Sequence, residues 1–207
     1  MKSLQVEVTL LSPLQLGSGK ADVILDSEAV HDRYGLPYFP GKRFKGLLYE
    51  SAIEMAEISN GSWFTKEEVD ALFGHGSSDT VAMRIDNLTL NDYEKKQEQW
   101  QYLQTSFPEL FNKDALWESY TSVRYQTAID ENGIADEGSL HNLRVVDVYV
   151  DVDARLKFTG SICLLQDVPK AQEILKKALM NLRYAGAKRN RGCGHIRCRL
   201  VDVSKGK

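Results

Sequence analysis

The segment from Val148 to Phe158 alternates apolar and polar side chains without interruption, and this pattern limits the possible folds more than any other feature of the sequence. Because successive side chains of a β-strand point to opposite faces, the alternation predicts one long strand that is buried on one side. We expect Thr159 and Gly160 to bend it before Ile162 and Leu164. The chain must therefore contain a sheet with one covered face.

Two helices and three more strands are predicted on either side of that segment. Alternation predicts strands over residues 4–10 and 81–85, and a last strand whose buried side carries Ile196, Cys198 and Leu200. Helical spacing from Phe44 to Ile58 follows Pro40-Gly41, which predicts the first helix. A second helix should be capped by Asp167, hold Pro169 in its first turn and stop at Gly186. Its apolar side is predicted to contain Ile174, Leu175, Ala178, Leu179 and Leu182.

The order strand, helix, strand, strand, helix, strand is that of a split βαβ unit. We therefore expect an α+β, ferredoxin-like (RRM-like) fold and a single domain over residues 1–207. Residues 91–144 lose clear periodicity and contain stretches rich in charge and turn residues. We interpret them as an inserted helical and hairpin region.

Composition indicates the cellular location of the protein and argues against disulfides and structural zinc. The 207 residues are 43% apolar, as in a soluble globular protein, and no run of 18 apolar residues or leader-like N-terminus occurs, so we expect a cytoplasmic protein without a membrane contact. Its three cysteines lack CxxC spacing, which argues against a disulfide framework and a structural zinc site. A cluster of Cys193, His195 and Cys198 is disfavoured because residue 198 should face the opposite side of the strand.

The charge distribution points to phosphates although the total charge is -3. Six cations and no acid occur between Arg183 and Arg199. Charges more than about 10 Å away are largely screened at moderate salt, so a local basic surface can bind nucleic acid on an acidic chain.

Two basic segments are the candidate phosphate sites. The first helix opens with Lys42, Arg43 and Lys45, where the helix dipole is already positive, so a bound phosphate would turn repulsion into attraction. These cations could equally be solvated surface side chains. The loop from Gly186 to Gly194 interleaves three more cations with glycines, which allow a backbone to approach phosphates closely. The cations of this second segment are Lys188, Arg189 and Arg191.

Several motifs resemble the RAMP superfamily of CRISPR proteins. The C-terminal AGAKRNRGCGHIRC is similar to its glycine-rich loop, and GLPYFPGKRFKGLLYESA (residues 35–52) is similar to the loop and first helix of type III backbone subunits. SPLQLGSG (residues 12–19) and the element Ile24-Leu25-Asp26 lie where those subunits have a glycine-bearing loop and a cleavage aspartate. The sequence departs from the family at Lys42 and Arg43, where small residues are usual, and after Asp26, where a proline is frequent.

The resemblance implies a subunit that polymerises along a guide RNA (crRNA) with other effector subunits, including further backbone subunits. A protruding hairpin is implied over residues 123–129, with its turn at 130–133 and its return at 139–140, and Arg124 in it is a candidate RNA contact. His195, on the same predicted strand face as Arg197, is another. The resemblance also implies that complementary target RNA is cut by attack of a ribose 2′-OH, with Asp26 as catalytic residue and ligand of a divalent cation, Mg²⁺ or Mn²⁺.

Three functions remain open at this point. The chain is a backbone subunit that binds guide RNA and cleaves target RNA, a structural RNA-binding subunit with an inert Asp26, or a metal-independent guide-processing endonuclease of the same superfamily. Asp26 could also serve only an Asx-turn with the backbone of Glu28. His31 and Asp32 could hold a metal ion or relay protons. A lone loop histidine, however, is more often simply solvated.

Overall fold

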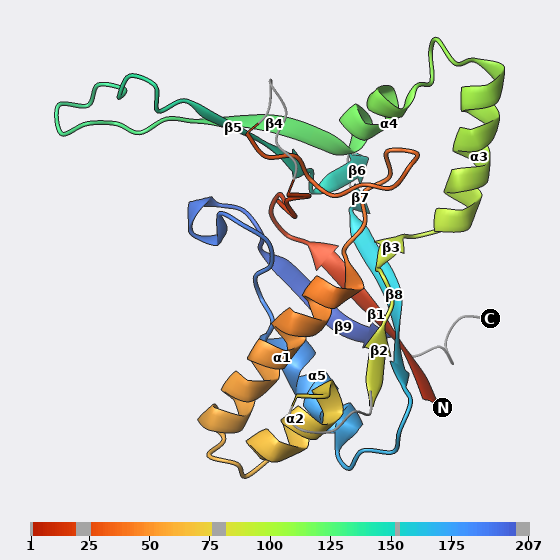
Figure 1. The fold of residues 1–207 in the computed structure, drawn as a ribbon, viewed down its shortest axis with the longest axis vertical. Helices are drawn as coiled ribbons and strands as arrows, with labels where there is room; N and C mark the ends of the chain where they lie inside the picture. Colours follow the sequence, from red (N-terminus) through yellow and green to blue (C-terminus); the bar gives the residue numbers. More distant parts are fainter. Residues whose placement is uncertain (1, 20–25, 76–81, 152–153, 202–207) are drawn as a thin grey trace.

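An antiparallel sheet with helices on one face forms the body of the protein (Figure 1). The computed structural model describes residues 2–19, 26–75, 82–151 and 154–201. The sheet has the strand order β2-β8-β1-β9, with β3 also paired to β8. Its strands are β1 (Lys2–Leu10), β2 (Met83–Ile85), β3 (Thr89–Leu90), β8 (Lys157–Leu164) and β9 (Ile196–Val201). The fold is thus mixed α and β with antiparallel sheets.

The core lies between this sheet and three helices. The helices are α1 (Gly41–Ile58), α2 (Lys66–Phe73) and α5 (Ala171–Asn181). Val6, Val8 and Leu10 of β1 are fully buried, and Val8 pairs with the buried Phe158. The predicted apolar side of α5 is buried as expected, and the hydroxyl of Ser51 in α1 donates to the carbonyl of Ala178 at 2.9 Å. The opposite, polar face of the sheet bears no helix of this group.

The prediction of one strand from Val148 to Phe158 is wrong. The segment forms two short paired strands, β6 (Tyr149–Asp151) and β7 (Ala154–Arg155), and the amide of Leu156 donates back to the carbonyl of Val148. Alternation persists because each short strand keeps a period of two. Gly160 does not interrupt a strand, since β8 is continuous from Lys157 to Leu164. A Cβ at Gly160 would lie 2.9 Å from Cγ of Leu88, so this glycine leaves room for a packed leucine.

Helix α5 is shorter than predicted at both ends. It begins at Ala171, after Lys170 in a left-handed conformation (φ +57°), so Asp167 does not cap it. It ends at Asn181, before Gly186. Gly186 instead has φ +75°, and a Cβ there would overlap the carbonyl oxygen of Gln15. The glycine therefore serves the packing of two loops.

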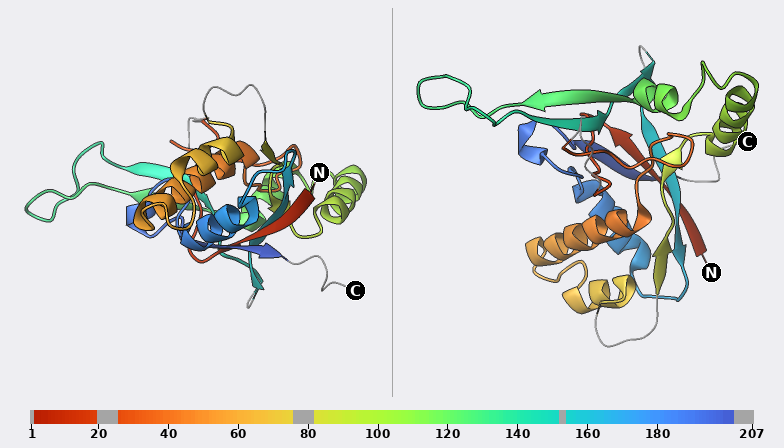
Figure 2. Two further views of the ribbon diagram at one scale, coloured as in Figure 1. Left: turned by 90° about the horizontal axis from the view of Figure 1, so that it is seen from below. Right: turned by 45° about the horizontal axis from the view of Figure 1, so that its top comes forward.

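The residues between β3 and β6 form two helices and a hairpin (Figures 1 and 2). The helices are α3 (Tyr93–Ser106), which has no buried residue, and α4 (Lys113–Tyr120), which buries Leu116 and Trp117. Strands β4 (Thr121–Gln126) and β5 (His141–Val146) pair antiparallel, and the hairpin projects far from the body. Its tip turns at residues 130–133, where Gly133 has φ +79° and donates to the carbonyl of Asp130.

The described ranges contain free thiols and no helix suited to crossing a bilayer. Cys163, Cys193 and Cys198 are all unpaired. In these ranges no helix combines the length and apolar character needed to cross a bilayer.

Candidate nucleic-acid interface

The glycine-rich loop between α5 and β9 has an unusual backbone. Lys188, Gly192 and Gly194 all have positive φ, and residues 189–191 form one turn of 3-10 helix. The loop is anchored to the segment after β1, because the amide of Ala187 donates to the carbonyl of Gln15 at 2.9 Å and that of Gly194 to Pro13 at 2.8 Å. The anchoring fixes the places from which the loop cations project.

A groove separates this loop from the start of α1. Arg43 and Arg189 both line it, together with Gly17, Gly46 and one acid, Glu50. The Nε atom of Arg189 donates to the carbonyl of Gly186 at 3.1 Å, which holds the guanidinium group at the loop. The groove has a volume of about 440 Å³. Two cations that are far apart in the sequence therefore flank one concave surface.

A second groove lies between the loop and the end of the β4–β5 ladder that is nearer the hairpin tip. Lys188 and Arg191 line it from the loop, and Gln126, Ser139 and His141 line it from the hairpin. Its volume is about 610 Å³. The face of β5 that carries His141 also carries Leu143 and Val145, which pack on Cys193 of the loop. This small apolar contact keeps hairpin and loop together. The glycine-rich loop thus has a groove with two cations on each side, and among the described residues the one beside the hairpin contains no acid.

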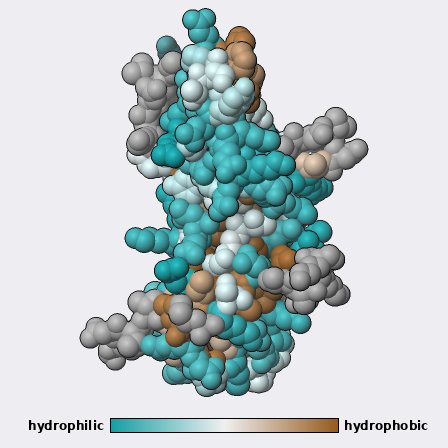
Figure 3. All heavy atoms as spheres, turned by 90° about the vertical axis from the view of Figure 1, so that its right-hand side faces the viewer, coloured by the Kyte–Doolittle hydropathy of each residue, from teal (hydrophilic) through white to brown (hydrophobic). Residues whose placement is uncertain are grey.

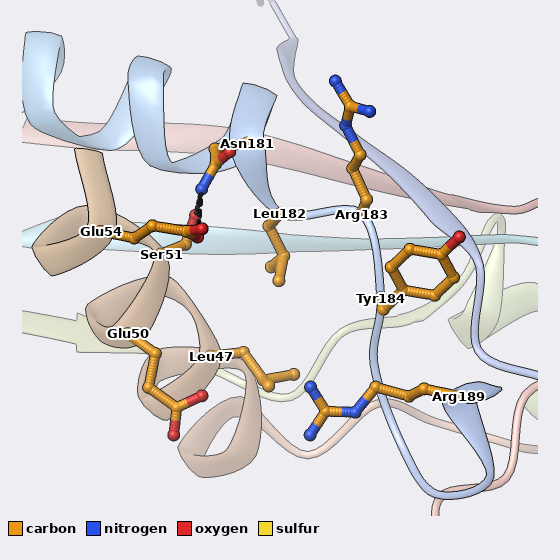
Figure 4. Close-up of a pocket in the computed structure, with 9 residues that line it drawn as sticks. All are labelled: Leu47, Glu50, Ser51, Glu54, Asn181, Leu182, Arg183, Tyr184 and Arg189. Carbon is orange, nitrogen blue, oxygen red and sulfur yellow. Dashed lines mark hydrogen bonds between the residues drawn. The ribbon is translucent and has the colours of Figure 1, made fainter. Parts of the chain in front are cut away.

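A third concavity at Arg189 is less suited to phosphate. Figure 4 shows Glu50 and Glu54 of α1 on one side of it, and Arg183, Tyr184 and Arg189 on the other. Two carboxylates in the lining would repel a phosphate group.

The three cations of α1 do not act together. Lys42 and Arg43 are exposed, but Nζ of Lys45 donates to the carbonyl of Met83 at 3.3 Å, and burial lowers the pKa of Lys45. Gly41 lies against the backbone of Ile85, and its amide donates to the side chain of Asn87. Only Arg43 lines the groove at the glycine-rich loop.

The other two predicted RNA contacts lie apart from these grooves. His195 precedes β9, stacks on Tyr184 with ring centroids 5.1 Å apart, and donates its amide to the hydroxyl of Ser12. We predicted that His195 shares a strand with Arg197, but β9 begins only at Ile196. Arg124 is exposed on β4, two residues from Gln126 and hence on the same face of the hairpin.

Asp26 lies beside the start of β5, at the end of the ladder that is nearer the hairpin tip. Its Oδ2 atom accepts from the amide of Asn142 at 2.8 Å and lies 3.7 Å from Nδ1 of His141. Its side chain is 57% exposed. An Asx-turn would require the carboxylate to accept from the backbone amide of Glu28. The carboxylate instead accepts from the amide of Asn142 in β5. Residues 20–25, which include Ile24, Leu25 and Asp22, lie outside the described ranges.

The neighbouring acids are committed to internal contacts. Glu28 pairs with Arg144 at 3.3 Å and accepts from the indole of Trp117. Asp32 accepts from two backbone amides and from the side chains of Tyr93 and Gln97. Of these three carboxylates, that of Asp26 is the exposed one.

The donors near Asp26 do not form a metal site by themselves. In the described part of the chain no group of three or more His, Cys, Asp or Glu side chains could hold a metal ion. Asp26 and His141 supply two candidate donors, and Mg²⁺ in nucleic-acid enzymes is commonly held by one or two carboxylates with phosphate oxygens and water. His141 was missed by the sequence analysis, because only the hairpin pairing brings it to Asp26.

Comparisons with known proteins give the family and the fold. The sequence matches the family model described as RAMP superfamily over residues 7–197. The fold is similar to a chain in the cryo-EM structure of the type III-B Cmr-beta bound to cognate target RNA, with a TM-score of 0.69, 12% identity and 97% of each chain covered. A chain of the apo-state Cmr-beta gives a TM-score of 0.67 at 13% identity, with 97% of this chain and 98% of that chain covered. No curated protein matches. Because the family match spans most of the length of this chain, the chain belongs to the RAMP superfamily.

Proposed function

We propose that the chain is a backbone subunit of a type III CRISPR effector, which binds guide RNA and cleaves complementary target RNA in the cytoplasm. Its partners would be the guide RNA, the target RNA and other effector subunits, including further copies of the backbone subunit. Membership of the RAMP superfamily and the similarity to Cmr-beta chains support the proposal.

The strand order supports a finer description of the fold. We assign β1, α1, β2, β8, α5 and β9 to one split βαβ unit of ferredoxin-like type, since the sheet order β2-β8-β1-β9 places the first and third strands of that unit at the centre. Residues 91–144 would be an insertion into a single domain over residues 1–207. This insertion would carry the projecting hairpin.

The observation that carries the RNA-binding proposal is the pair of grooves on either side of the glycine-rich loop, each with two cations. Arg43 and Arg189 flank one groove, and Lys188 and Arg191 flank the other. A phosphate backbone crossing the loop would meet both pairs in succession. Phosphate contacts of this kind bind without regard to sequence, as a guide-binding subunit requires.

The test is the salt dependence of RNA binding. Changing Lys188 and Arg191 to alanine should weaken binding to unrelated single-stranded RNAs equally, and should reduce the slope of log K against log salt by about 1.4 for two lost contacts. The matched control changes Lys95 and Lys176, two exposed cations away from the grooves, and should leave the slope unchanged. An unchanged slope in the groove variant would contradict the proposed interface.

Cleavage is assigned to Asp26. A 2′-oxygen would bond to the adjacent phosphorus while the bond from phosphorus to the 5′-oxygen breaks, which leaves a cyclic phosphate and a 5′-hydroxyl. Asp26 would either take the proton of the 2′-OH or hold a divalent cation, Mg²⁺ or Mn²⁺, together with phosphate oxygens. A bound cation would neutralise charge on the phosphate. The exposure of Asp26 beside the hairpin, where its neighbours Glu28 and Asp32 are internal, supports this assignment.

A structural role for Asp26 has an observation of its own, namely its hydrogen bonds to Asn142. Asp26→Asn keeps an acceptor oxygen for the Asn142 amide and removes the charge. Guide-dependent cleavage in Mg²⁺ should then fall by orders of magnitude while RNA affinity stays constant. Normal cleavage by this variant would make Asp26 structural only. Cleavage of a repeat hairpin by the isolated chain in EDTA would instead indicate a guide-processing endonuclease.

A further inference from the structure

A basic concavity lies on the face of the sheet opposite α1 and α5. Four cations from β7, β8 and β9 line it, and these are Arg155, Lys157, Arg197 and Arg199. Among the described residues Glu7 is the one acid in its lining, and its volume is about 580 Å³. It shares no described residue with either groove at the glycine-rich loop. The proposed guide interface therefore makes no use of these cations.

The strand register arranges the cations in rows. Thr9 of β1 pairs with Lys157 on one side and with Arg197 on the other, so the two cations flank it in one row. Arg199 lies two residues further along β9, in the next row, where it pairs with Glu7. A strand rises about 3.4 Å per residue, so neighbouring rows lie about 7 Å apart. Successive phosphates of an extended RNA strand have a comparable spacing, so the array suits a phosphate backbone.

Glu7 neutralises only part of this positive charge. One oxygen of its carboxylate accepts from Nε of Arg199 at 2.9 Å, and the other lies 3.5 Å from Nζ of Lys157. Glu7 is only 8% exposed, so this carboxylate holds both cations at the surface from below. In the described ranges the guanidinium groups of Arg155 and Arg197 form no hydrogen bond or ion pair. Two exposed cations thus remain for a negatively charged ligand.

The other lining residues fit a phosphate site better than a protein interface. They are Thr9, Asn91 and Ala154, so the described lining contains no large apolar side chain. The centre of a protein interface is usually apolar and aromatic, whereas Lys, Arg, Thr and Asn side chains commonly contact phosphates. Figure 3 views the molecule from the right-hand side of Figure 1, where β1 and β8 lie, and shows mainly hydrophilic side chains around a smaller apolar area. A hydrated, positively charged surface of this kind favours a nucleic acid.

One exposed aromatic ring borders the cations. Tyr149 of β6 is 52% exposed, and the guanidinium group of Arg155 lies 5.9 Å from the centre of its ring. Bases of single-stranded RNA stack on exposed aromatic rings, and cations beside such a ring contact the adjoining phosphates. A free phosphate or an acidic peptide would have no such use for the ring. The pair therefore favours RNA among the anionic ligands.

We propose that this concavity is a second RNA-binding site, which holds phosphates of a single-stranded segment outside the grooves and stacks one base on Tyr149. The inference rests on the proposed function in taking RNA as the ligand. Strand β9 begins two residues after Gly194, so a short stretch of chain links the cations of the glycine-rich loop to Arg197 and Arg199. Because the two sites share no described residue, a variant of one leaves the other intact, and each can fail alone.

The experiment measures the affinity of the whole chain for oligouridine at several salt concentrations. The RNA has about 20 nucleotides, which exceeds a typical site on one small domain. The concavity variant carries Arg155→Ala and Arg197→Ala, which leaves the pairs of Glu7 intact. It should bind more weakly, and the slope of log K against log salt should fall by about 1.4 for two lost phosphate contacts. Tyr149→Ala should weaken binding about tenfold and leave the slope unchanged.

Two matched variants separate phosphate binding from other effects. Arg155→Lys with Arg197→Lys keeps both charges and should restore most of the slope, because a lysine also binds phosphate as a point charge. Lys66→Ala with Lys176→Ala removes two exposed cations from α2 and α5, on the other face of the sheet, and should leave affinity and slope unchanged.

The outcomes distinguish this inference from the proposed guide interface. An unchanged slope in the concavity variant overturns the second site, even where the variant of Lys188 and Arg191 loses its share of the slope. A reduced slope in the concavity variant alone supports the second site and contradicts the groove interface. If the concavity variant keeps its RNA affinity and loses self-association in sedimentation, the surface binds protein and the inference is overturned.

Discussion

Asp26 and Asn142 exchange two hydrogen bonds. The amide of Asn142 donates to Oδ2 of Asp26 at 2.8 Å, and the amide of Asp26 donates to Oδ1 of Asn142 at 2.9 Å. The bridge between Ser27 and Leu143 continues this contact, so the loop runs beside β5 like a short edge strand. The position of the proposed catalytic carboxylate is therefore set by the hairpin.

Asn142→Ala should consequently impair cleavage and leave the affinity for RNA unchanged. The variant loses the acceptor for the Asp26 amide but keeps its own backbone donor to Asp26, so the loop is loosened and stability should fall by about 1 kcal/mol. We expect a reduced single-turnover cleavage rate with unchanged target affinity, less severe than that of Asp26→Asn. A cleavage rate equal to that of the natural protein would show that the hydrogen bond does not position Asp26.

The pair of Glu28 and Arg144 should matter for stability. Their side chains are 22% and 14% exposed, and loss of the carboxylate charge leaves Arg144 largely buried without its counter-charge. Removing one partner of a fully buried ion pair costs roughly 3–5 kcal/mol, and the partial exposure of this pair reduces that cost. We therefore expect Glu28→Gln to lower the free energy of unfolding by about 1–3 kcal/mol, as measured by urea denaturation. Lys66→Ala breaks an exposed pair with Asp70 and should cost below about 1 kcal/mol.

Gly186 and Gly192 form a matched pair of left-handed glycines, with φ of +75° and +76°. A Cβ at Gly192 meets no atom within 4 Å, whereas one at Gly186 overlaps the carbonyl of Gln15. Gly192→Ala should thus cost only the left-handed conformation, about 1–2 kcal/mol. Gly186→Ala should cost clearly more and lower the melting temperature further. Equal losses would show that the loop can move away from Gln15.

Asp130 should keep the hairpin turn closed in mild acid. Its carboxylate accepts from the amides of Ile134 and Asn132, and these hydrogen bonds, led by that of Ile134, lower the pKa of Asp130. With a depressed pKa in the folded state, the contribution to stability is complete above the ordinary value near 3.8 and is lost as the pH falls through the lower folded value. Amide NMR signals of residues 132 and 134 should therefore stay unchanged down to about pH 4. Movement of these signals between pH 6 and 5 would contradict this.

The cysteines should differ in reactivity. Burial raises the pKa of Cys198 to about 12, so its thiolate is scarce at pH 8. Cys163 is partly exposed on the helix-free face of the sheet. Iodoacetamide should modify Cys163 first, as peptide mass analysis can show, and all three thiols only in denaturant. Early modification of Cys198 would indicate opening of the sheet edge.

Much of the fold can be predicted from local pattern. The alternation in β1 and β9 and the apolar side of α5 are local properties, and the structure buries nearly all of the predicted side chains, although Leu200 is only partly buried. The same reasoning failed at Val148 to Phe158, because a period of two is identical in one strand and in two strands that fold back on each other. It also failed at Gly160 and Gly186, where the reason for glycine is a residue distant in the sequence, Leu88 or Gln15.

The candidate site depended more on tertiary structure. The sequence by itself determined the glycine-rich loop, its cations and an aspartate after a short apolar element, because these are composition and motif. Only the fold decided that Lys45 turns to the carbonyl of Met83, that Lys188 and Arg191 face the hairpin, and that His141 lies beside Asp26. Side-chain direction and contacts over more than a hundred residues depend on sheet register and loop anchoring, which no local window of sequence contains.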